Sequence, residues 1–168
     1  MNVGGDMKNI AILVADGFED TELIGAIDFW TREEIDFDLI SIHNKKEVKG
    51  SYFAKIDTIP IDGINFDNYE HLFIPGGKSG VHFQNFNRTT EIILDFYNKN
   101  KGVFAICAAP LLLHQANILK DKTFTCWPGL NLPKSTNSEC EISGNVITGR
   151  DYLSTISFAK EVSKYIKK

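Results

Sequence analysis

The chain has 168 residues, of which 43% are hydrophobic and 24% are charged, a composition typical of one globular domain and not of a disordered chain. Its 22 acidic and 18 basic residues give a net charge of −4 without a basic block, which excludes recognition of nucleic acid through its phosphates. The apolar stretch 9–15 ends at Asp16, too early for a signal-peptide core or a membrane span.

Three cysteines without a C-x-x-C pair favour a reducing compartment over a disulfide framework. We therefore expect a cytoplasmic protein with no membrane contact. We also expect a single domain over 1–168, with residues 1–7 frayed because they show no periodicity.

Apolar runs and helical spacing alternate along the chain. Short apolar runs bounded by turn residues predict buried strands over 10–15, 37–42, 71–74 and 103–106. Helical spacing predicts a first helix capped by Asp20 or Thr21, a second that starts near 89–90 and ends before Gly102, and two more over 108–116 and 153–166. Strands that alternate with helices imply parallel pairing and helices on both faces of a sheet. The sequence predicts an α/β, flavodoxin-like three-layer sandwich with a mostly parallel sheet.

Two segments depart from this alternation. Residues 47–67 contain short alternating pieces and a turn at 60–63, which predicts a small β-hairpin excursion. After a polar stretch over 131–145, the apolar pair at 146–147 predicts a last edge strand before Gly149.

The third strand-to-helix junction carries a cysteine. Cys107 follows an apolar strand, has alanines two residues before and after it, and precedes a helix that Pro110 opens. This pattern is typical of a nucleophile elbow, where small neighbours avoid a clash between strand and helix. A thiol at a helix start is favoured as thiolate, so we expect a lowered pKa. The alternative is a small buried core residue, which is our interpretation of Cys126 and Cys140.

Glycines and a glutamate follow the neighbouring strands. Gly76 and Gly77 precede Lys78 and Ser79, but a phosphate loop would need a glycine where the chain has Leu72. The loop is either a tight turn or a source of backbone N–H groups for an oxyanion. Glu22 is either a solvated carboxylate near a helix start, or a proton donor or base that faces Cys107. The sequence has no Cys/His cluster with metal-ligand spacing, so we expect no metal and no cofactor.

The chain resembles the ThiJ/PfpI family, in the branch of the Parkinsonism-associated protein DJ-one and the bacterial protein YajL. The resemblance is carried by residues 11–22 (A-I-L-V-A-D-G-F-E-D-T-E), 73–77 (F-I-P-G-G), 104–110 (F-A-I-C-A-A-P) and 148–150 (T-G-R). It implies that Cys107 is the nucleophile and oxidation-sensitive centre, and that Glu22 forms a hydrogen bond with it. Backbone N–H groups at Gly77 and Ala108 match those that bind an oxyanion in this family.

Two positions depart from the family pattern. Trp127 stands where many members have histidine, and because an indole N–H cannot accept a proton, a Cys-His peptidase mechanism is not expected. The same change weakens a glyoxalase mechanism that relies on that histidine. Arg150 keeps a family contact for small molecules or anions, although Asp151 and Tyr152 replace the usual glycine-rich run.

Three functions compete on this basis. The first is a cofactor-independent enzyme of the glyoxalase or deglycase type, in which Cys107 adds to a small reactive carbonyl and Glu22 moves the proton. The second is an oxidative-stress sensor or chaperone-like protein in which Cys107 is oxidised to the sulfinate. The third is a flavodoxin-like binding module with an inert cysteine. The resemblance also implies a homodimer, with 47–67 and the first helix as candidate surfaces.

Overall fold

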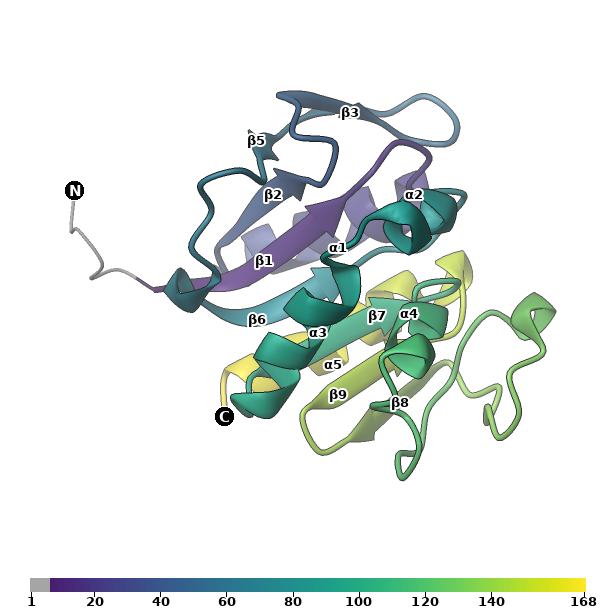
Figure 1. The fold of residues 1–168 in the computed structure, drawn as a ribbon. Coiled ribbons are helices and arrows are strands. Elements are labelled where there is room, and N and C mark those ends of the chain that lie inside the picture. Colours follow the sequence, from purple (N-terminus) through teal and green to yellow (C-terminus); the bar gives the residue numbers. More distant parts are fainter. Residues whose placement is uncertain (1–6) are drawn as a thin grey trace.

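The computed structural model describes residues 7–168, and the predicted fraying of the N-terminus falls largely on residues 1–6, outside the described part. A seven-stranded sheet forms the middle layer (Figure 1). Its order is β5-β2-β1-β6-β7-β9-β8, and only the β8–β9 pair is antiparallel. The strands are β1 (Lys8–Val14), β2 (Phe37–Ser41), β5 (Ile59–Pro60), β6 (Tyr69–Ile74), β7 (Gly102–Ile106), β8 (Cys140–Ser143) and β9 (Val146–Gly149).

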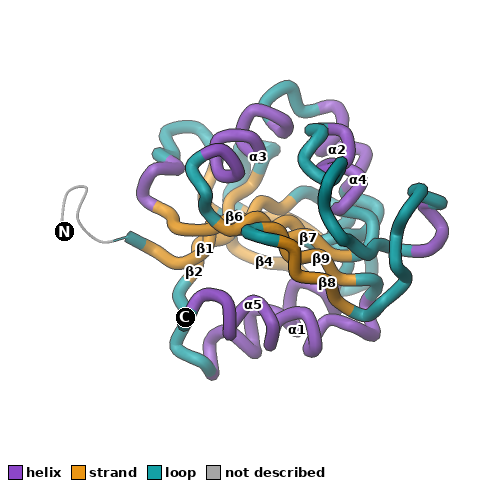
Figure 2. Tube along the Cα trace, turned by 90° about the horizontal axis from the view of Figure 1, so that it is seen from below, coloured by secondary structure: helices purple, strands orange, loops and turns teal. Residues whose placement is uncertain are grey.

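Helices cover both faces of the sheet, as Figure 2 shows from below. Helices α1 (Asp20–Arg32) and α5 (Thr155–Ile166) pack against each other on one face. Helices α2 (Gly80–Asn85), α3 (Thr89–Asn98) and α4 (Pro110–Gln115) lie on the other. Single 3₁₀ turns occur at η1 (Phe66–Asn68), η2 (Pro128–Leu130) and η3 (Tyr152–Ser154). The predicted flavodoxin-like sandwich is confirmed.

Strand β1 shows why the sheet is buried on both sides. Successive side chains of a strand point to opposite faces, and every β1 residue from Ile10 to Val14 is apolar and fully buried. Ile10, Ile12 and Val14 belong to the core under α1 and α5, whereas Ala11 and Leu13 belong to the core under α3 and α4. A continuous apolar run of this kind is expected of a parallel strand in the centre of a sheet.

The predicted hairpin excursion is confirmed. Strands β3 (Glu47–Lys49) and β4 (Lys55–Asp57) form a separate two-stranded antiparallel sheet. Its turn spans 50–54. A turn also occurs at the predicted position, where the Ile64 N–H donates to the Ile61 carbonyl, but it follows Pro60 at the end of β5 and does not join the two strands of the hairpin. The hairpin contacts the connection between β1 and α1, because the Gly17 N–H donates to the Lys49 carbonyl over 2.8 Å.

Four further predictions are wrong in detail, and one helix was not predicted. Neither Asp20 nor Thr21 caps the first helix, because Glu19 occupies the cap position and the Asp20 carboxylate binds the hairpin turn. The strand at 146–149 is not at the edge, because β8 pairs with its outer side. Helix α2 was not expected, and α4 and α5 begin two residues later than predicted. Within residues 7–168 no helix has the length and apolar character needed to cross a bilayer.

Candidate active site

The backbone at Cys107 has a conformation that residues other than glycine rarely adopt. Its φ is +65°, in the left-handed region, which costs energy and is retained where the surroundings enforce it. The Cys107 N–H donates to the Gly149 carbonyl over 2.9 Å, and the Cys107 carbonyl accepts from the Trp127 N–H over 2.7 Å. The chain turns at once, since the Ala109 N–H donates to the Ile106 carbonyl. Cys107 therefore has the strained strand-to-helix turn predicted for a nucleophile elbow.

Glu22 lies in the first turn of α1 and is fully buried. Its Oε1 accepts the Gly76 N–H over 3.0 Å. Its Oε2 has no hydrogen-bond partner among residues 7–168, and the Cys107 thiol lies beside the carboxyl group. A buried carboxyl group with a free oxygen is costly in its charged form, so this environment favours the protonated acid. Of the two interpretations of Glu22, the structure excludes the solvated carboxylate.

Gly76 separates the two side chains and leaves no room for a side chain of its own. A Cβ at this position would lie 2.7 Å from Glu22 Oε1 and 2.8 Å from Cys107 Cβ. Because both atoms lie so close to Gly76, the side chains of Glu22 and Cys107 approach each other at this glycine. Gly77 follows with φ +107°, a conformation for which glycine is the usual residue.

The ionisation of Glu22 and Cys107 is coupled. Burial raises the pKa of Glu22 to about 8, although its contacts with the Cys107 thiol and the Gly76 N–H oppose the rise. Burial also raises the pKa of the Cys107 thiol, and a carboxylate at Glu22 raises it further, whereas the Ala108 N–H lowers it. The predicted lowering of the thiol pKa is therefore wrong, because desolvation outweighs the helix start. The two shifts are linked, because the charge on an ionised Glu22 is one of the causes that raise the pKa of the Cys107 thiol.

A pocket of about 620 Å³ opens over Cys107. Its lining comes from the first turn of α1 and from six separate connections: the β1–α1 loop, the hairpin turn, the β6–α2 loop, the β7–α4 turn, the segment around η2 and the segment around η3. The lining residues are Glu19, Glu22, Ser51, Tyr52, Gly77, Lys78, Cys107, Ala108, Trp127, Pro128, Asp151 and Tyr152. The pocket lies at the carboxyl ends of the parallel strands, where open α/β sheets bind their ligands.

Trp127 forms part of the wall beside Cys107. Its ring packs over the backbone of Gly129, since a Cβ there would lie 2.6 Å from Trp127 Cζ2. The side chain is about half exposed, and it offers the pocket an apolar face and one N–H donor. Trp127 is therefore a wall of the pocket with no group that can act as a base.

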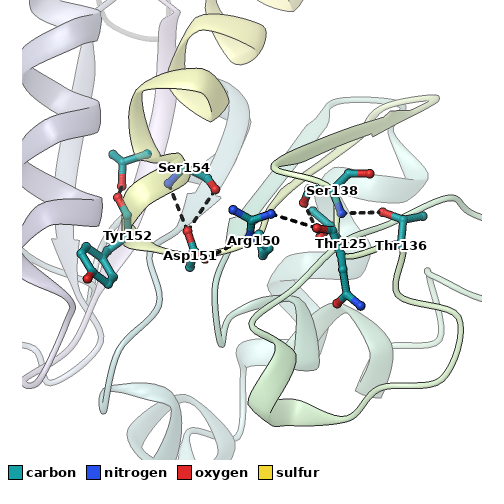
Figure 3. Close-up of polar contacts among 9 residues, drawn as sticks. Thr125, Thr136, Ser138, Arg150, Asp151, Tyr152 and Ser154 are labelled. Carbon is teal, nitrogen blue, oxygen red and sulfur yellow. Dashed lines mark hydrogen bonds and ion pairs between the residues drawn. The ribbon is translucent and has the colours of Figure 1, made fainter.

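Arg150 does not line the pocket. Its Nε donates to Asp151 Oδ2 over 3.0 Å, and its Nη1 donates to the Asn137 carbonyl over 3.0 Å. Figure 3 shows this side chain reaching from Asp151 toward the segment of Thr136 and Ser138. The other oxygen of Asp151 accepts from Ser154. Arg150 thus holds the side chain of Asp151 in place, and Asp151 lines the pocket.

Sequence reasoning missed the contributions of Glu19, Ser51, Tyr52 and Asp151 to this site. Ser51 and Tyr52 come from the hairpin turn, and no local signal distinguishes them from other polar turn residues. Glu19 could have been found from its place three residues before Glu22 in the loop after β1. Among residues 7–168 no group of three or more His, Cys, Asp or Glu side chains is placed to hold a metal ion.

Comparisons with known proteins show the family and the fold of this chain. Residues 8–165 match the model of the DJ-1/PfpI family. The chain is 33% identical over 120 residues to "Protein/nucleic acid deglycase 2" of Escherichia coli, which covers 70% of each protein. A protein named as a deglycase in Pyrococcus abyssi is 25% identical over 94% of this chain and 99% of its own. The crystal structure of a ThiJ/PfpI domain protein from Brachyspira murdochii has the same fold, with a TM-score of 0.88, 17% identity and coverage of 97% of this chain and 98% of that one. The chain belongs to the DJ-1/PfpI family.

Proposed function

We propose that this protein is a cofactor-independent enzyme of the deglycase or glyoxalase type that removes small reactive carbonyls in stress protection. Both curated relatives described above are named as deglycases. The observation that carries the proposal is the buried Glu22 carboxyl group, which lies beside the Cys107 thiol where both side chains line an open pocket.

The thiol and the carboxyl group together supply a nucleophile and a proton carrier. In the ionised form of the pair, Glu22 accepts the thiol proton while Sγ forms a bond to the aldehyde carbon. Glu22 then returns that proton to the carbonyl oxygen, which completes a hemithioacetal and leaves Glu22 ionised. A pKa of about 8 for Glu22 suits this role, because proton carriers work best when their pKa lies near the ambient pH.

Two backbone N–H groups support the transient negative charge. The Gly77 N–H has no acceptor among residues 7–168, and the Ala108 N–H points at the sulfur of Cys107. Both residues line the pocket. Donors fixed in this way stabilise an oxyanion as it forms, which is the role that the resemblance implies for Gly77 and Ala108.

The remaining steps return the enzyme to its starting state. With an α-oxoaldehyde, Glu22 removes the proton from the carbon bonded to sulfur and delivers it to the neighbouring carbonyl carbon. The hydroxyl proton of the hemithioacetal moves to the neighbouring carbonyl oxygen, which gives the thioester of a hydroxy acid. Water then cleaves the thioester, releases the hydroxy acid and restores the thiol. No electron leaves the system, so no external oxidant or cofactor is needed.

The test is turnover of methylglyoxal without added cofactor. Cys107→Ser and Glu22→Gln are each expected to lower kcat by about 10² or more, the range for loss of a nucleophile or acid–base group. Cys126→Ser is the matched control, because Cys126 is buried and does not line the pocket. Full activity in Cys107→Ser would refute the mechanism.

A second function rests on the same carboxyl group. A protonated Glu22 can donate a hydrogen bond to an oxidised Cys107, which favours arrest at the sulfinate on the thiol oxidation ladder. A redox sensor of this kind is expected to oxidise selectively at Cys107. Mass spectrometry after peroxide treatment measures this, and equal oxidation of Cys107, Cys126 and Cys140 would contradict it.

A further inference from the structure

The carboxylate of Asp20 binds the turn of the β3–β4 hairpin. Its Oδ2 accepts the N–H groups of Phe53 over 2.9 Å and Ala54 over 2.8 Å, and its Oδ1 accepts the N–H of Tyr52 over 3.2 Å. The Asp20 side chain is buried, with 4% exposure. One carboxylate therefore holds three successive backbone N–H groups of a turn that is remote from it in sequence.

The approach of the two segments is close. A Cβ at Gly50 would collide with the Asp20 carboxylate, so only glycine fits there. Next to it, the Ser51 N–H donates to the Phe18 carbonyl over 2.8 Å, and the Ser51 hydroxyl donates to the Gly17 carbonyl over 2.7 Å. These hydrogen bonds fix the hairpin turn to the loop that leads into α1. Helix α1 begins at Asp20, two residues before Glu22.

The carboxylate is suited to hold the turn as an anion. Desolvation tends to raise the pKa of Asp20, but the hydrogen bonds from Phe53, Ala54 and Tyr52 outweigh it and hold the pKa below its usual range. Hydrogen bonds to a charged acceptor are about twice as strong as neutral ones. Asp20 is therefore ionised at neutral pH and anchors the turn.

The turn residues reach the pocket. Ser51 and Tyr52 line the same cavity as Cys107, although they belong to a small sheet separate from the main one. We propose that Asp20 is a positioning residue that holds the hairpin turn as a wall of the pocket and thereby limits the size of the molecules that reach Cys107. This inference rests on the proposed function only where it implies a preference for small carbonyls, because access to the thiol is measured without turnover.

The test compares two alkylating reagents of different size in a Cys126→Ser, Cys140→Ser background. Iodoacetamide serves as the small reagent, and a maleimide joined to a polyethylene glycol chain serves as the large one. In Asp20→Ala the ratio of the large-reagent rate to the small-reagent rate is expected to rise about tenfold, because loss of the anchor makes local opening of the turn easier. Asp20→Asn keeps one acceptor oxygen and is expected to give a smaller rise.

Two matched controls separate this effect from general destabilisation. Asp28→Asn changes an exposed carboxylate on the same helix, which pairs only with Arg32. Gly50→Ala displaces the same turn from the hairpin side, whereas Gly80→Ala places a methyl group in open space. The rate ratio is expected to rise in Gly50→Ala and to stay at the wild-type value in Asp28→Asn and Gly80→Ala.

Hydrogen exchange of the backbone N–H groups of residues 52–54 gives the independent readout. Unchanged protection in Asp20→Ala would overturn the inference, because Asp20 would not hold the turn. Faster exchange with an unchanged rate ratio would also overturn it, because the turn would not limit access. If Asp20→Ala does not fold, Asp20→Asn and Gly50→Ala decide the matter. Carbonyl turnover that survives Cys107→Ser would refute the proposed function and leave these alkylation results unaffected.

Discussion

The buried carboxyl group of Glu22 destabilises the fold when it is ionised, and in the proposed mechanism it carries the proton. Transfer of its carboxyl group from water to the interior disfavours the charged form, and only the Gly76 N–H and the Cys107 thiol offset this cost. A side chain that destabilises the fold when ionised is expected where function requires it. The residue scale therefore offers two measurements, one of reactivity and one of stability.

The first prediction concerns the reactivity of Cys107. In the Cys126→Ser, Cys140→Ser background, the rate of alkylation by iodoacetamide is expected to rise with pH around an apparent pKa near 8, where the Glu22–Cys107 pair loses a proton. Glu22→Gln removes one partner of the pair, so the rise near pH 8 is expected to disappear. A profile that stays the same in Glu22→Gln would show that the two groups are not coupled.

The second prediction concerns the free energy of unfolding. The pKa of Glu22 is higher in the folded state, about 8, than its reference value of 4.5, so the folded state binds the proton more tightly. The contribution of protonated Glu22 to the free energy of unfolding is then fully present below pH 4.5. It is lost as the pH rises toward 8, and the loss is on the order of 3 kcal/mol at pH 7. Urea unfolding is expected to show this loss in the wild type relative to Glu22→Gln. Parallel pH curves for the two proteins would contradict it.

At the residue scale, the sequence predicts the backbone turn at Cys107 but not the pKa of its thiol. The small residues around Cys107 predict its turn, and φ +65° agrees with that turn. The pKa of the thiol could not be predicted, because it depends on how deeply the sulfur is buried and on Glu22, 85 positions earlier in the chain. The roles of Cys107 and Glu22 remain predictions until their variants are assayed.

Short elements are the ones that the sequence does not predict. The long apolar runs that form β1 and β7 are unmistakable, but β5 has two residues, and α2 has six without a side-chain cap. Such elements form because neighbouring segments pair with them and not because of their own pattern. The same reason explains β8, whose antiparallel pairing with β9 depends on the turn at 144–145.

His71 provides a prediction for the pairing of β6 and β7. It is largely buried, and its Nδ1 accepts the N–H of the buried Gly102 over 2.9 Å. Burial lowers the pKa of His71 to about 4 from 6.5, and the nearby Lys101 adds to the shift. The folded state therefore favours neutral imidazole, so its contribution to stability is present above pH 6.5 and falls as pH drops toward 4, by about 2 kcal/mol at pH 5.

The measurement compares the wild type with His71→Leu. At pH 7 the variant is expected to be less stable by about 1–3 kcal/mol, because the Gly102 N–H is left without an acceptor. At pH 5 this difference is expected to shrink, because the variant has no imidazole to protonate. A difference that stays constant between pH 7 and pH 5 would show that His71 does not titrate as expected.

At the scale of the whole molecule, large exposed apolar side chains occur on the hairpin turn, on η3 and on helices α1 and α5. Phe53 on the hairpin turn is 86% exposed and Leu153 in η3 is 72% exposed, while Ile24 on α1 and Ile156 on α5 are also exposed and lie near the contact of these helices at Gly25. Large exposed apolar patches are typical of interaction sites. We propose that they form the homodimer interface that the family resemblance implies.

Light scattering coupled to size-exclusion chromatography tests the dimer. The wild type is expected at twice the chain mass of 18.9 kDa. Phe53→Asp combined with Leu153→Asp is expected to reduce the measured mass to that of one chain, because a charge buried at an interface is costly. Ile142→Asp, an exposed position on the edge strand β8, is the control and is expected to leave the mass unchanged. A wild type that elutes as one chain would contradict the proposal.

The hydrogen bonds that hold the Cys107 backbone have a consequence for synthesis of the protein. Both partners, Trp127 and Gly149, follow Cys107 in the chain, so the ribosome makes them after the cysteine. A nascent chain that ends before β9 has neither the strained turn nor the closed surroundings of the thiol, and its cysteine has the ordinary solution pKa of ~8.5. The strained turn at Cys107 therefore cannot form until the chain has been made through Gly149 of β9.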